Sequence, residues 1–300
     1  MKQLESLYKN KQVLVTGGAG FIGSHLVEKL VELGARVSVL DNFSTGNLNN
    51  LRSVLAHITL IYADVVHLHS VLKATANKDF VFHLAAFVSV AQSVNQSDLC
   101  WKINVEGTRN VLEGCYQNNV KTLVFSSSSA VYGNQNSHCH ETDTPQPMSP
   151  YAKSKYEGEK LCKEYAAKYA FNTTCLRYFN VYGNRQNPQG VYAAVVAQFK
   201  NNLLTKKPLT IYGDGTQTRD FINVDEVVQA NLRLALLNKS VGEVFNIGSG
   251  TSMNLFELIA NLEQELKIQK TDIDFKPSRE NDIMHSQANC EKYQKLVAGL

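Results

Sequence analysis

A glycine-rich turn between an apolar strand and an apolar helix constrains the fold more than any other feature. Gly17, Gly20 and Gly23 follow the apolar run Gln12–Thr16 and open a segment of helical period, Phe21–Leu33. The first glycine permits a sharp turn, the second lets backbone N–H groups approach a pyrophosphate, and the third lets the helix pack on the strand. A lone glycine motif could be only a tight turn, but strand, turn and helix in this order predict a dinucleotide site.

An acidic residue stands at the end of the next predicted strand. Asp41 follows Arg36–Leu40, and its carboxylate can accept hydrogen bonds from the adenosine ribose hydroxyls while repelling a 2′-phosphate. NAD is therefore expected in preference to NADP, although Asp41 could instead cap a turn. Asp64 ends another predicted strand and could receive the adenine amino group.

The first 178 residues alternate between apolar, β-rich runs and segments of helical period, which predicts an α/β fold with a doubly wound parallel (Rossmann) sheet of about six or seven strands. The expected strands are Gln12–Thr16, Arg36–Leu40, the run around Ile58–Tyr62, Phe80–Leu84, Lys121–Ser126 and Thr173–Tyr178. The expected helices include Phe21–Leu33, Leu99–Asn118 and Tyr151–Tyr169.

The pattern changes after Phe179, where glycine and proline separate short elements and predict a smaller α/β substrate-binding lobe. These residues are Gly183, Pro188, Gly190, Pro208, Gly213 and Gly215. We expect residues 1–178 to form the NAD-binding domain and 179–220 with 248–300 to form the lobe. Residues 221–247 are expected to return to the first domain as a helix, Phe221–Leu237, and a strand, Val244–Ile247.

Composition excludes several other classes of protein. The 300 residues are 44% hydrophobic and can bury a full core. The 30 Lys+Arg nearly balance the 27 Asp+Glu, and the net charge of +3 predicts neither nucleic acid nor an anionic membrane as partner. Without a signal peptide or a membrane-spanning run, we expect a cytoplasmic protein.

The cysteines are dispersed along a chain too long to need disulfide bonds, and we expect reduced thiols. They are Cys100, Cys115, Cys139, Cys162, Cys175 and Cys290. No second pair at ligand spacing accompanies His138, Cys139 and His140, so this segment predicts a polar loop and no metal site.

Tyr151 and Lys155 lie one turn apart at the start of a predicted helix that follows Pro150. A tyrosine pKa is ordinarily ~10, but an adjacent ammonium and an oxidised nicotinamide both favour the phenolate, so Tyr151 is a candidate general base. An exposed aromatic ring beside a solvated lysine is the alternative. The serine-rich run at 126–129 extends from a strand at the carboxyl end of the sheet, where α/β folds place ligands.

The spacing G-x-x-G-x-x-G, with DNFSTG at 41–46, ADV at 63–65, HLAA at 83–86 and NVEGT at 104–108, resembles the extended short-chain dehydrogenase/reductase family over most of the chain. The resemblance implies an NAD site. Its implied residues are Gly17, Gly20, Phe21, Ile22, Gly23, Asp41, Asn42, Ser44, Thr45, Gly46, Asp64, Val65, Leu84, Ala85, Ala86, Tyr151, Lys155 and Tyr178.

The same resemblance implies the catalytic residues. It places the catalytic serine at Ser128, which would hydrogen-bond the sugar 4-oxygen and relay its proton to Tyr151. Lys155 would hold the nicotinamide ribose and bias the charge of the tyrosine. Ser127 and Ser129 are supporting candidates for substrate binding, and either could simply satisfy backbone groups of the loop.

Several reactions run on this scaffold, and the serine loop discriminates among them. Related dehydratases carry an additional acid and base beside the serine, whereas Ser129 and Ala130 stand there in this chain. We therefore expect reversible C4 epimerisation through a 4-keto sugar, with NAD held tightly between turnovers. A sugar-nucleotide 4,6-dehydratase or reductase is the alternative, and a noncatalytic NAD-binding protein is another.

Later motifs resemble UDP-hexose 4-epimerases, namely LRYFNVYG at 176–183, YAAV at 192–195, IYGDGTQTRDF at 211–221 and REND at 279–282. By this resemblance Asn180 and Arg219 bind the diphosphate, while Arg279 and Asp282 bind the nucleotide end. An isolated arginine could equally be a surface ion-pair partner, but its planar fork suits phosphate oxygens. Further implied substrate residues are Tyr192, Ala193, Val195 and Tyr212.

Ser286 occupies the position that decides sugar size in these relatives. Enzymes restricted to plain hexoses place a tyrosine there, whereas a small side chain leaves room for a 2-acetamido group. With the four serines, this resembles UDP-N-acetylglucosamine 4-epimerases, so UDP-N-acetylglucosamine and UDP-N-acetylgalactosamine are the expected substrates. UDP-glucose or a uronic acid derivative stays open, as does a mere loop role for Ser286.

Two expectations concern assembly and length. Relatives use the helices equivalent to residues 99–118 and 151–169 for a dimer seam, so a homodimer is expected, although these apolar positions could equally cover their own sheet. The family usually continues beyond a segment like Tyr293–Leu300, and the chain could therefore be truncated.

Overall fold

The computed structural model describes residues 2–135, 138–187, 195–237, 241–268, 271–278 and 283–298. A seven-stranded sheet forms its centre, with strand order β11-β6-β5-β4-β1-β2-β3 and every pair parallel. The strands are β1 (Gln12–Thr16), β2 (Arg36–Asp41), β3 (Ile58–Tyr62), β4 (Phe80–His83), β5 (Thr122–Ser128), β6 (Asn172–Tyr178) and β11 (Glu243–Ile247). The predicted doubly wound parallel sheet is confirmed.

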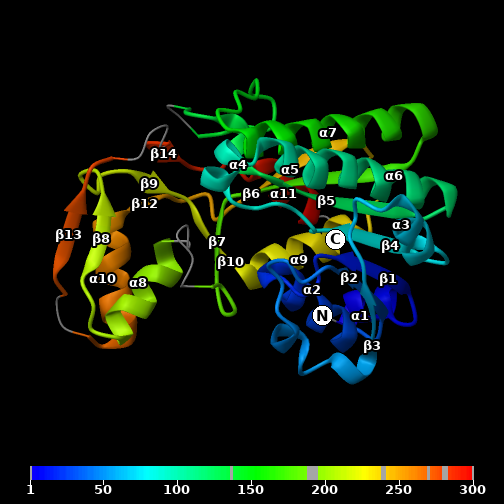
Figure 1. Cartoon of the computed structure of the whole chain (residues 1–300), viewed down its shortest axis with the longest axis horizontal. Helices are drawn as coiled ribbons and strands as arrows, with labels where there is room; N and C mark the ends of the chain where they lie inside the picture. The colour runs from blue at the N-terminus through cyan, green and yellow to red at the C-terminus, as the bar shows by residue number, and fades with distance from the viewer. Residues whose placement is uncertain are drawn as a thin grey trace.

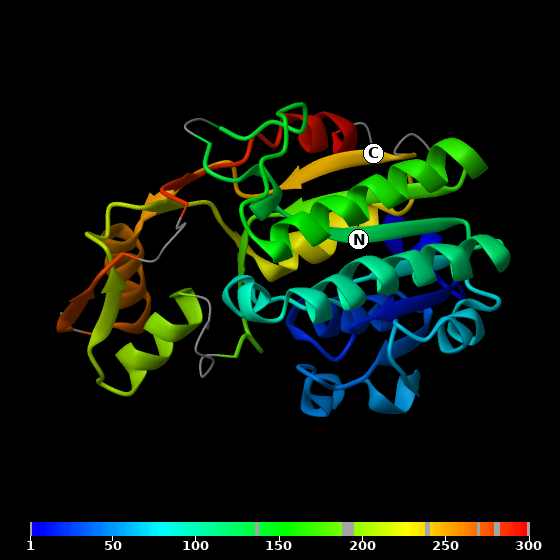
Figure 2. The ribbon, with the colours of Figure 1, turned by 45° about the horizontal axis from the view of Figure 1, so that its top comes forward.

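Helices cover both faces of this sheet (Figures 1 and 2). One face carries α3 (Leu68–Thr75), α6 (Gly107–Gln117) and α7 (Pro150–Tyr169), and the other carries α2 (Phe21–Glu32) and α9 (Val224–Leu234). Parallel sheets need this double cover because both of their faces are apolar. The remaining helices of the large unit are α1 (Lys2–Tyr8), α4 (Val90–Asn95), α5 (Ser97–Trp101) and α11 (Glu291–Val297), with short helical turns η1 (Leu48–Leu51), η2 (Leu55–His57) and η4 (Ser129–Tyr132).

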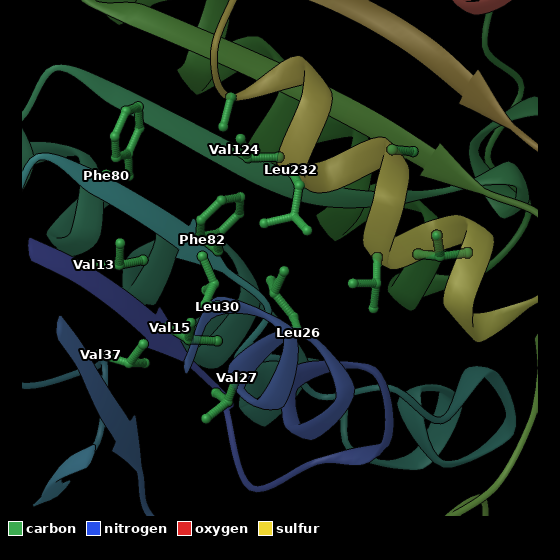
Figure 3. Close-up of a cluster of buried hydrophobic side chains, with 14 of the residues drawn as sticks. Val13, Val15, Leu26, Val27, Leu30, Val37, Phe80, Phe82, Val124 and Leu232 are labelled. Atoms are coloured by element: carbon green, nitrogen blue, oxygen red, sulfur yellow. The ribbon is translucent and has the colours of Figure 1, made fainter. Parts of the chain in front are cut away.

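The core beneath β1 shows how the glycine turn is held. Val13 and Val15 point from β1 toward Leu26 and Leu30 of α2, and Phe82 of β4 lies among them (Figure 3). Each of these side chains is fully buried. The apolar period of α2 therefore fixes its first turn at the carboxyl end of β1, between the ends of β2 and β4.

Beside the large unit lies a smaller group of elements (Figure 1). Three small sheets pair as β10-β7, β12-β9-β14 and β13-β8, and a separate apolar cluster joins them to two helices. The bounds are β7 (Asn180–Tyr182), α8 (Val195–Leu204), β8 (Leu209–Tyr212), β9 (Thr218–Arg219), β10 (Phe221–Asn223), β12 (Met253–Asn254), α10 (Leu255–Leu266), β13 (Ile273–Lys276) and β14 (His285–Ser286).

Two predicted helices differ from the structure. The segment Phe221–Leu237 begins as strand β10, because Phe221–Asn223 pairs with β7, and the side chain of Asn223 then caps α9 at the N–H of Asp225. The segment Leu99–Asn118 is helical as far as Gln117 but not uniform, since a π-helical turn, η3 (Lys102–Glu106), separates α5 from α6.

Candidate active site

A cleft of about 990 Å³ runs along the carboxyl ends of β1 to β5 and under the segment that follows β6. The chain reverses its direction of winding between β1 and β4, and open α/β sheets bind ligands at such a switch point. Every cofactor residue named from the sequence lines this cleft: Gly17, Gly20, Phe21, Ile22, Gly23, Asp41, Asn42, Ser44, Thr45, Gly46, Asp64, Val65, Leu84, Ala85, Ala86, Tyr151, Lys155 and Tyr178.

The glycine turn has the shape that a pyrophosphate requires. Gly17 has φ +70°, and a Cβ there would lie 2.6 Å from the backbone nitrogen of Ala85. Gly20 caps α2 without a side-chain hydrogen bond, which leaves the first-turn N–H groups for an anion. Asp41 is ordered beside them, because its carboxylate accepts the N–H groups of Ala19 at 2.9 Å and Phe43 at 2.8 Å. These residues fit a dinucleotide.

Asp64 is tied to the same end of the cleft. Its Oδ2 accepts the amide of Asn42 at 2.7 Å and its Oδ1 accepts the N–H of Val66 at 3.0 Å. The two acids that line the cleft therefore stand at the ends of β2 and β3, on the side of β1 that lies away from the serines.

His83 joins the strands beneath the cleft, a role that sequence reasoning missed. Its Nδ1 lies 2.7 Å from Thr16 Oγ1, and its Nε2 lies 3.0 Å from Thr108 Oγ1. Desolvation, and then the charge of Lys155, lower the pKa of His83 to about 3. The buried imidazole is therefore neutral at ordinary pH and bridges two hydroxyl groups.

The catalytic candidates meet where α7 begins against the end of β5. Lys155 is buried, and its Nζ donates to the main-chain oxygen of Ser126 at 2.8 Å while lying 6.0 Å from the ring centroid of Tyr151. Ser128 accepts the N–H of Ala130 and also hydrogen-bonds Tyr151. The structure thus brings the predicted serine, tyrosine and lysine together.

The electrostatics of Tyr151 run against the expectation of a readily ionised phenol. Although the residue as a whole is only partly buried, desolvation of the phenol raises the pKa of Tyr151 to about 12, and the hydrogen bond from Ser128 opposes that rise. Desolvation likewise lowers the pKa of Lys155 to about 8. The neighbouring lysine does not by itself make Tyr151 acidic.

Two further side chains support this corner of the site, and neither was predicted from the sequence. Ser93 of α4 accepts the N–H of Tyr151 at 3.1 Å, so it supports the first turn of α7 together with the Ser149 cap. Asn104, in the π-helical turn, donates to Ser154 at 2.9 Å and accepts the N–H of Phe87 at 2.7 Å. Only the position of Asn104 in the NVEGT motif could have drawn attention to it.

The substrate candidates are more dispersed. Ser127 and Ser128 line the cleft, while Ser129 begins η4. Asn180 donates to the main-chain oxygen of Asp220 at 2.9 Å. Among the described residues, the others lie in the smaller group of elements: Val195 begins α8, Tyr212 ends β8, and Arg219 ends β9.

Ser286 does not line the catalytic cleft. It lines a second hollow of about 620 Å³ and lies in register with Arg219 across β14 and β9, so the two side chains share one face of that small sheet. Four predicted residues lie outside the described part of the chain: Tyr192, Ala193, Arg279 and Asp282. The roles of all substrate candidates stay predictions.

The remaining sequence predictions can be placed. All six cysteines are buried with free thiols, and Cys139 forms a β-bridge with Ala288, so the segment around it is more ordered than a polar loop. Within the described residues, no cluster of three or more His, Cys, Asp or Glu could hold a metal ion. Nor does that part of the chain contain a helix with the length and apolarity needed to span a bilayer.

Comparisons with known proteins agree with this geometry. The family model described as NAD dependent epimerase/dehydratase family matches residues 13–248. A UDP-glucose 4-epimerase of Mycolicibacterium smegmatis is 36% identical over 291 residues, covering 95% of this chain and 92% of the relative. A UDP-N-acetyl-alpha-D-glucosaminuronate decarboxylase of Bacillus cytotoxicus is 36% identical over 260 residues, covering 85% and 80%.

Solved structures are similar over nearly the whole chain. The UDP-N-acetylglucosamine 4-epimerase of Methanobrevibacter ruminantium, in complex with UDP-N-acetylmuramic acid, has a TM-score of 0.92 at 38% identity and covers 96% of this chain and 92% of its own. The UDP-glucose 4-epimerase of Thermus thermophilus, in complex with NAD, has a TM-score of 0.87 at 34% identity, with 95% and 93% covered.

Proposed function

This chain belongs to the NAD-dependent epimerase/dehydratase family and is an enzyme of the UDP-sugar epimerase class, and we propose that it interconverts UDP-N-acetylglucosamine and UDP-N-acetylgalactosamine. UDP-glucose and UDP-galactose are weaker substrates in this proposal. The cofactor is NAD, and we propose that it stays bound between turnovers, because the reaction consumes no net oxidant.

One observation carries the proposal for epimerisation over elimination. Ser128, Tyr151 and Lys155 meet at the end of β5, and among the described residues that line the cleft the acids are Asp41 and Asp64. Strands β1 and β4 separate those two acids from the serines. Elimination of water from the sugar needs an additional acid and base, and the described wall of the cleft offers none beside Ser128.

The chain's own residues would move one proton and orient the sugar. Tyr151 would take the proton of the sugar 4-hydroxyl, and Ser128 would hold the 4-oxygen within hydrogen-bonding reach. Lys155 would keep its ammonium close to both through its bond to the Ser126 oxygen. When bound, NAD supplies the reversible uptake of the C4 hydride, so that a rotated 4-keto sugar can be reduced on its other face.

The preference for an acetylated sugar rests on Ser286. Its small side chain beside Arg219 would leave room for a 2-acetamido group, if Arg219 grips the diphosphate. The similar protein of Methanobrevibacter ruminantium, described as a UDP-N-acetylglucosamine 4-epimerase, supports the same choice. In this proposal residues 1–178 with 221–247 bind NAD, and residues 179–220 with 248–300 bind the sugar nucleotide.

We extend the proposal to a homodimer in the cytoplasm. Leu99, Trp101 and Tyr116 are each more than two-fifths exposed on α5 and α6, and a helical seam between two copies would cover them. Free thiols at all six cysteines suit a reducing compartment. Light scattering of the purified protein should give twice the chain mass of 33.4 kDa, whereas a single chain mass would refute the dimer.

The direct test is incubation of purified protein with UDP-N-acetylglucosamine and with UDP-glucose in separate reactions, without added NAD, followed by separation of the epimers. We expect the acetylated epimer to form faster. Release of water or carbon dioxide, or net consumption of NADH, would instead identify a dehydratase, a decarboxylase or a reductase.

A further inference from the structure

A buried ion pair lies directly behind the serine loop, and the mechanism above does not use it. Arg177 of β6 donates to Glu159 of α7 through Nε at 2.8 Å and Nη2 at 2.7 Å. Their side chains are only 3% and 1% exposed. Every other ion pair between described residues is far more exposed, with each side chain at 22% or above.

Burial makes this pair an unusual choice for stability alone. Removing two charges from water is so unfavourable that apolar residues of similar volume often serve as well. Desolvation alone would lower the pKa of Arg177, but the hydrogen bond and charge of Glu159 raise it overall. Among the described polar atoms Nη1 of Arg177 is also left without a hydrogen-bond partner. A specific geometric requirement would explain such an arrangement.

Glu159 also has a contact that could explain why the buried pair is present. Its Oε1 also accepts the hydroxyl of Ser127 at 2.5 Å, and Ser127 immediately precedes Ser128. Ser127 is 3% exposed, so its side chain is directed into the ion pair more than into the cleft. The carboxylate therefore ties α7 to the strand end that carries Ser128.

Side chains from three successive turns of α7 form hydrogen bonds with three consecutive serines of β5. Tyr151 and Lys155 bind Ser128 and the Ser126 oxygen, and Glu159, one turn further along the same face, binds Ser127. The helix can approach this closely because residue 158 is glycine, where a Cβ would lie 2.4 Å from the ring of Phe125. The third of these contacts, between Glu159 and Ser127, is the one that includes the ion pair.

Arg177 is also held by contacts on the side away from Glu159. The guanidinium of Arg177 lies 4.5 Å from the ring centroid of Tyr132, and the hydroxyl of Tyr132 donates to Asn246 of β11 at 2.6 Å. Asn246 in turn donates to the main-chain oxygens of Cys139 and Asn289 at 2.8 and 3.1 Å. Arg177 is thus fixed by elements that do not touch the cleft, and it can hold Glu159 in one place.

We propose that Glu159 is a positioning residue: held by Arg177, it anchors Ser127 and so fixes Ser128 against Tyr151. This inference rests on the proposed function for its kinetic consequence. Neither Glu159 nor Arg177 lines the cleft, and in this proposal they act only through Ser127.

The test compares Ser127→Ala with Thr173→Val in the full-length, NAD-loaded protein. Both changes delete a buried hydroxyl that bonds α7, but Thr173 donates to the oxygen of Cys162 at 2.8 Å and lies in register with Leu123 of β5, which precedes the serines. We expect Ser127→Ala to lower kcat by about 10- to 100-fold with KM nearly unchanged, since a misplacement on the order of 1 Å has that effect. Thr173→Val should leave kcat within about twofold of the wild type.

Two further readouts separate positioning from loss of stability. In Ser127→Ala the rise of kcat with pH should move to higher pH, because a displaced Ser128 no longer lowers the pKa of Tyr151, and hydrogen exchange should increase at residues 128–132. Glu159→Gln leaves the buried guanidinium without a counter-charge and can fail to fold, so Ser127→Ala decides the question. Unchanged kcat and pH profile in Ser127→Ala, or an equal loss in Thr173→Val, would overturn the proposal.

These experiments also distinguish an error in the proposed function from an error in the positioning role of Glu159. If the wild type converts none of the UDP-sugars offered, that function is refuted, while hydrogen exchange still reports on the serine loop. Exchange at residues 128–132 that is identical in Ser127→Ala and in the wild type would then refute the positioning role without any substrate.

Discussion

The Nζ of Lys155 lies 2.8 Å from the main-chain oxygen of Ser126 and donates a hydrogen bond to it. An ammonium has three N–H groups, so this bond fixes its position and leaves two for a ribose and the reacting corner. Because the oxygen belongs to the backbone of β5, the lysine is anchored to the same strand end that carries Ser128.

Replacing Lys155 with methionine should therefore lower kcat by about 10²- to 10⁴-fold, the range typical of a positioned acid–base partner. The long apolar stem is kept, so packing over Phe125 should persist and folding should be little changed. Steady-state kinetics with thermal unfolding checks both statements. Wild-type turnover in this variant would mean that the ammonium has no part in the reaction.

Tyr151→Phe should nearly abolish turnover while leaving bound NAD in place, because only the phenol oxygen is lost. The measurement is kcat together with the amount of dinucleotide released when the variant is denatured. Undiminished activity would contradict the proposed proton transfer, and loss of NAD would show that the phenol hydroxyl is needed to hold the cofactor.

The pH dependence of the wild type follows from burial of the phenol. In the proposed mechanism the phenolate is the active form, and desolvation raises the pKa of Tyr151 to about 12, so kcat should increase as pH rises from 6 to 9. Ser128→Ala removes a hydrogen bond that lowers this pKa, and its rise in kcat should therefore occur at higher pH. A pH profile that is the same in both proteins would contradict the assignment of Ser128.

His83 gives a prediction about stability. Its pKa in the folded protein is about 3 against an ordinary 6.5, so between these values the unfolded chain binds a proton that the folded protein does not. The free energy of unfolding should thus fall as pH decreases below 6.5, by up to about 1.4 kcal/mol per pH unit from this group. His83→Gln should flatten that dependence in urea unfolding, whereas the exposed control His69→Gln should not.

Sugar selectivity should respond to Ser286. Ser286→Tyr places a ring beside Arg219 and should reduce the ratio of kcat/KM for UDP-N-acetylglucosamine to that for UDP-glucose by about tenfold or more, a loss of about 1.4 kcal/mol in discrimination. Ser252→Tyr is a control for bulk, because Ser252 lines the same hollow. An unchanged ratio in Ser286→Tyr, or an equal change in both variants, would show that residue 286 is not the gate.

The parts of the site that sequence predicted well are those built from local backbone geometry. Local geometry within one βα unit or one helical turn determines the glycine turn, the place of Asp41 and the Tyr151–Lys155 spacing. A short sequence motif is therefore enough to predict each of them. This is why every predicted cofactor residue lines one cleft. The doubly wound sheet could be predicted from the alternation of β-rich and helical segments, because each segment is also recognised from local sequence.

What sequence could not supply were the distant polar partners and the effects of burial. Glu159 lies four residues after Lys155, so its place on the same helix face as Tyr151 could be read from the sequence. Its partner Arg177 lies on β6, and no sequence motif indicates that the two residues form a pair. The capping of Tyr151 by Ser93 also joins separate helices. Desolvation of the phenol, which raises the pKa of Tyr151, depends on all the elements around it.

The most direct test of the account follows one hydrogen atom. UDP-N-acetylglucosamine carrying deuterium at C4 is incubated with the purified protein in ordinary water, without added NAD, and the product is analysed by mass spectrometry. Because bound NAD would return the same hydride to the opposite face, we predict UDP-N-acetylgalactosamine that keeps the deuterium at C4. Product that has lost the deuterium to water, or the absence of any epimer, would contradict the account.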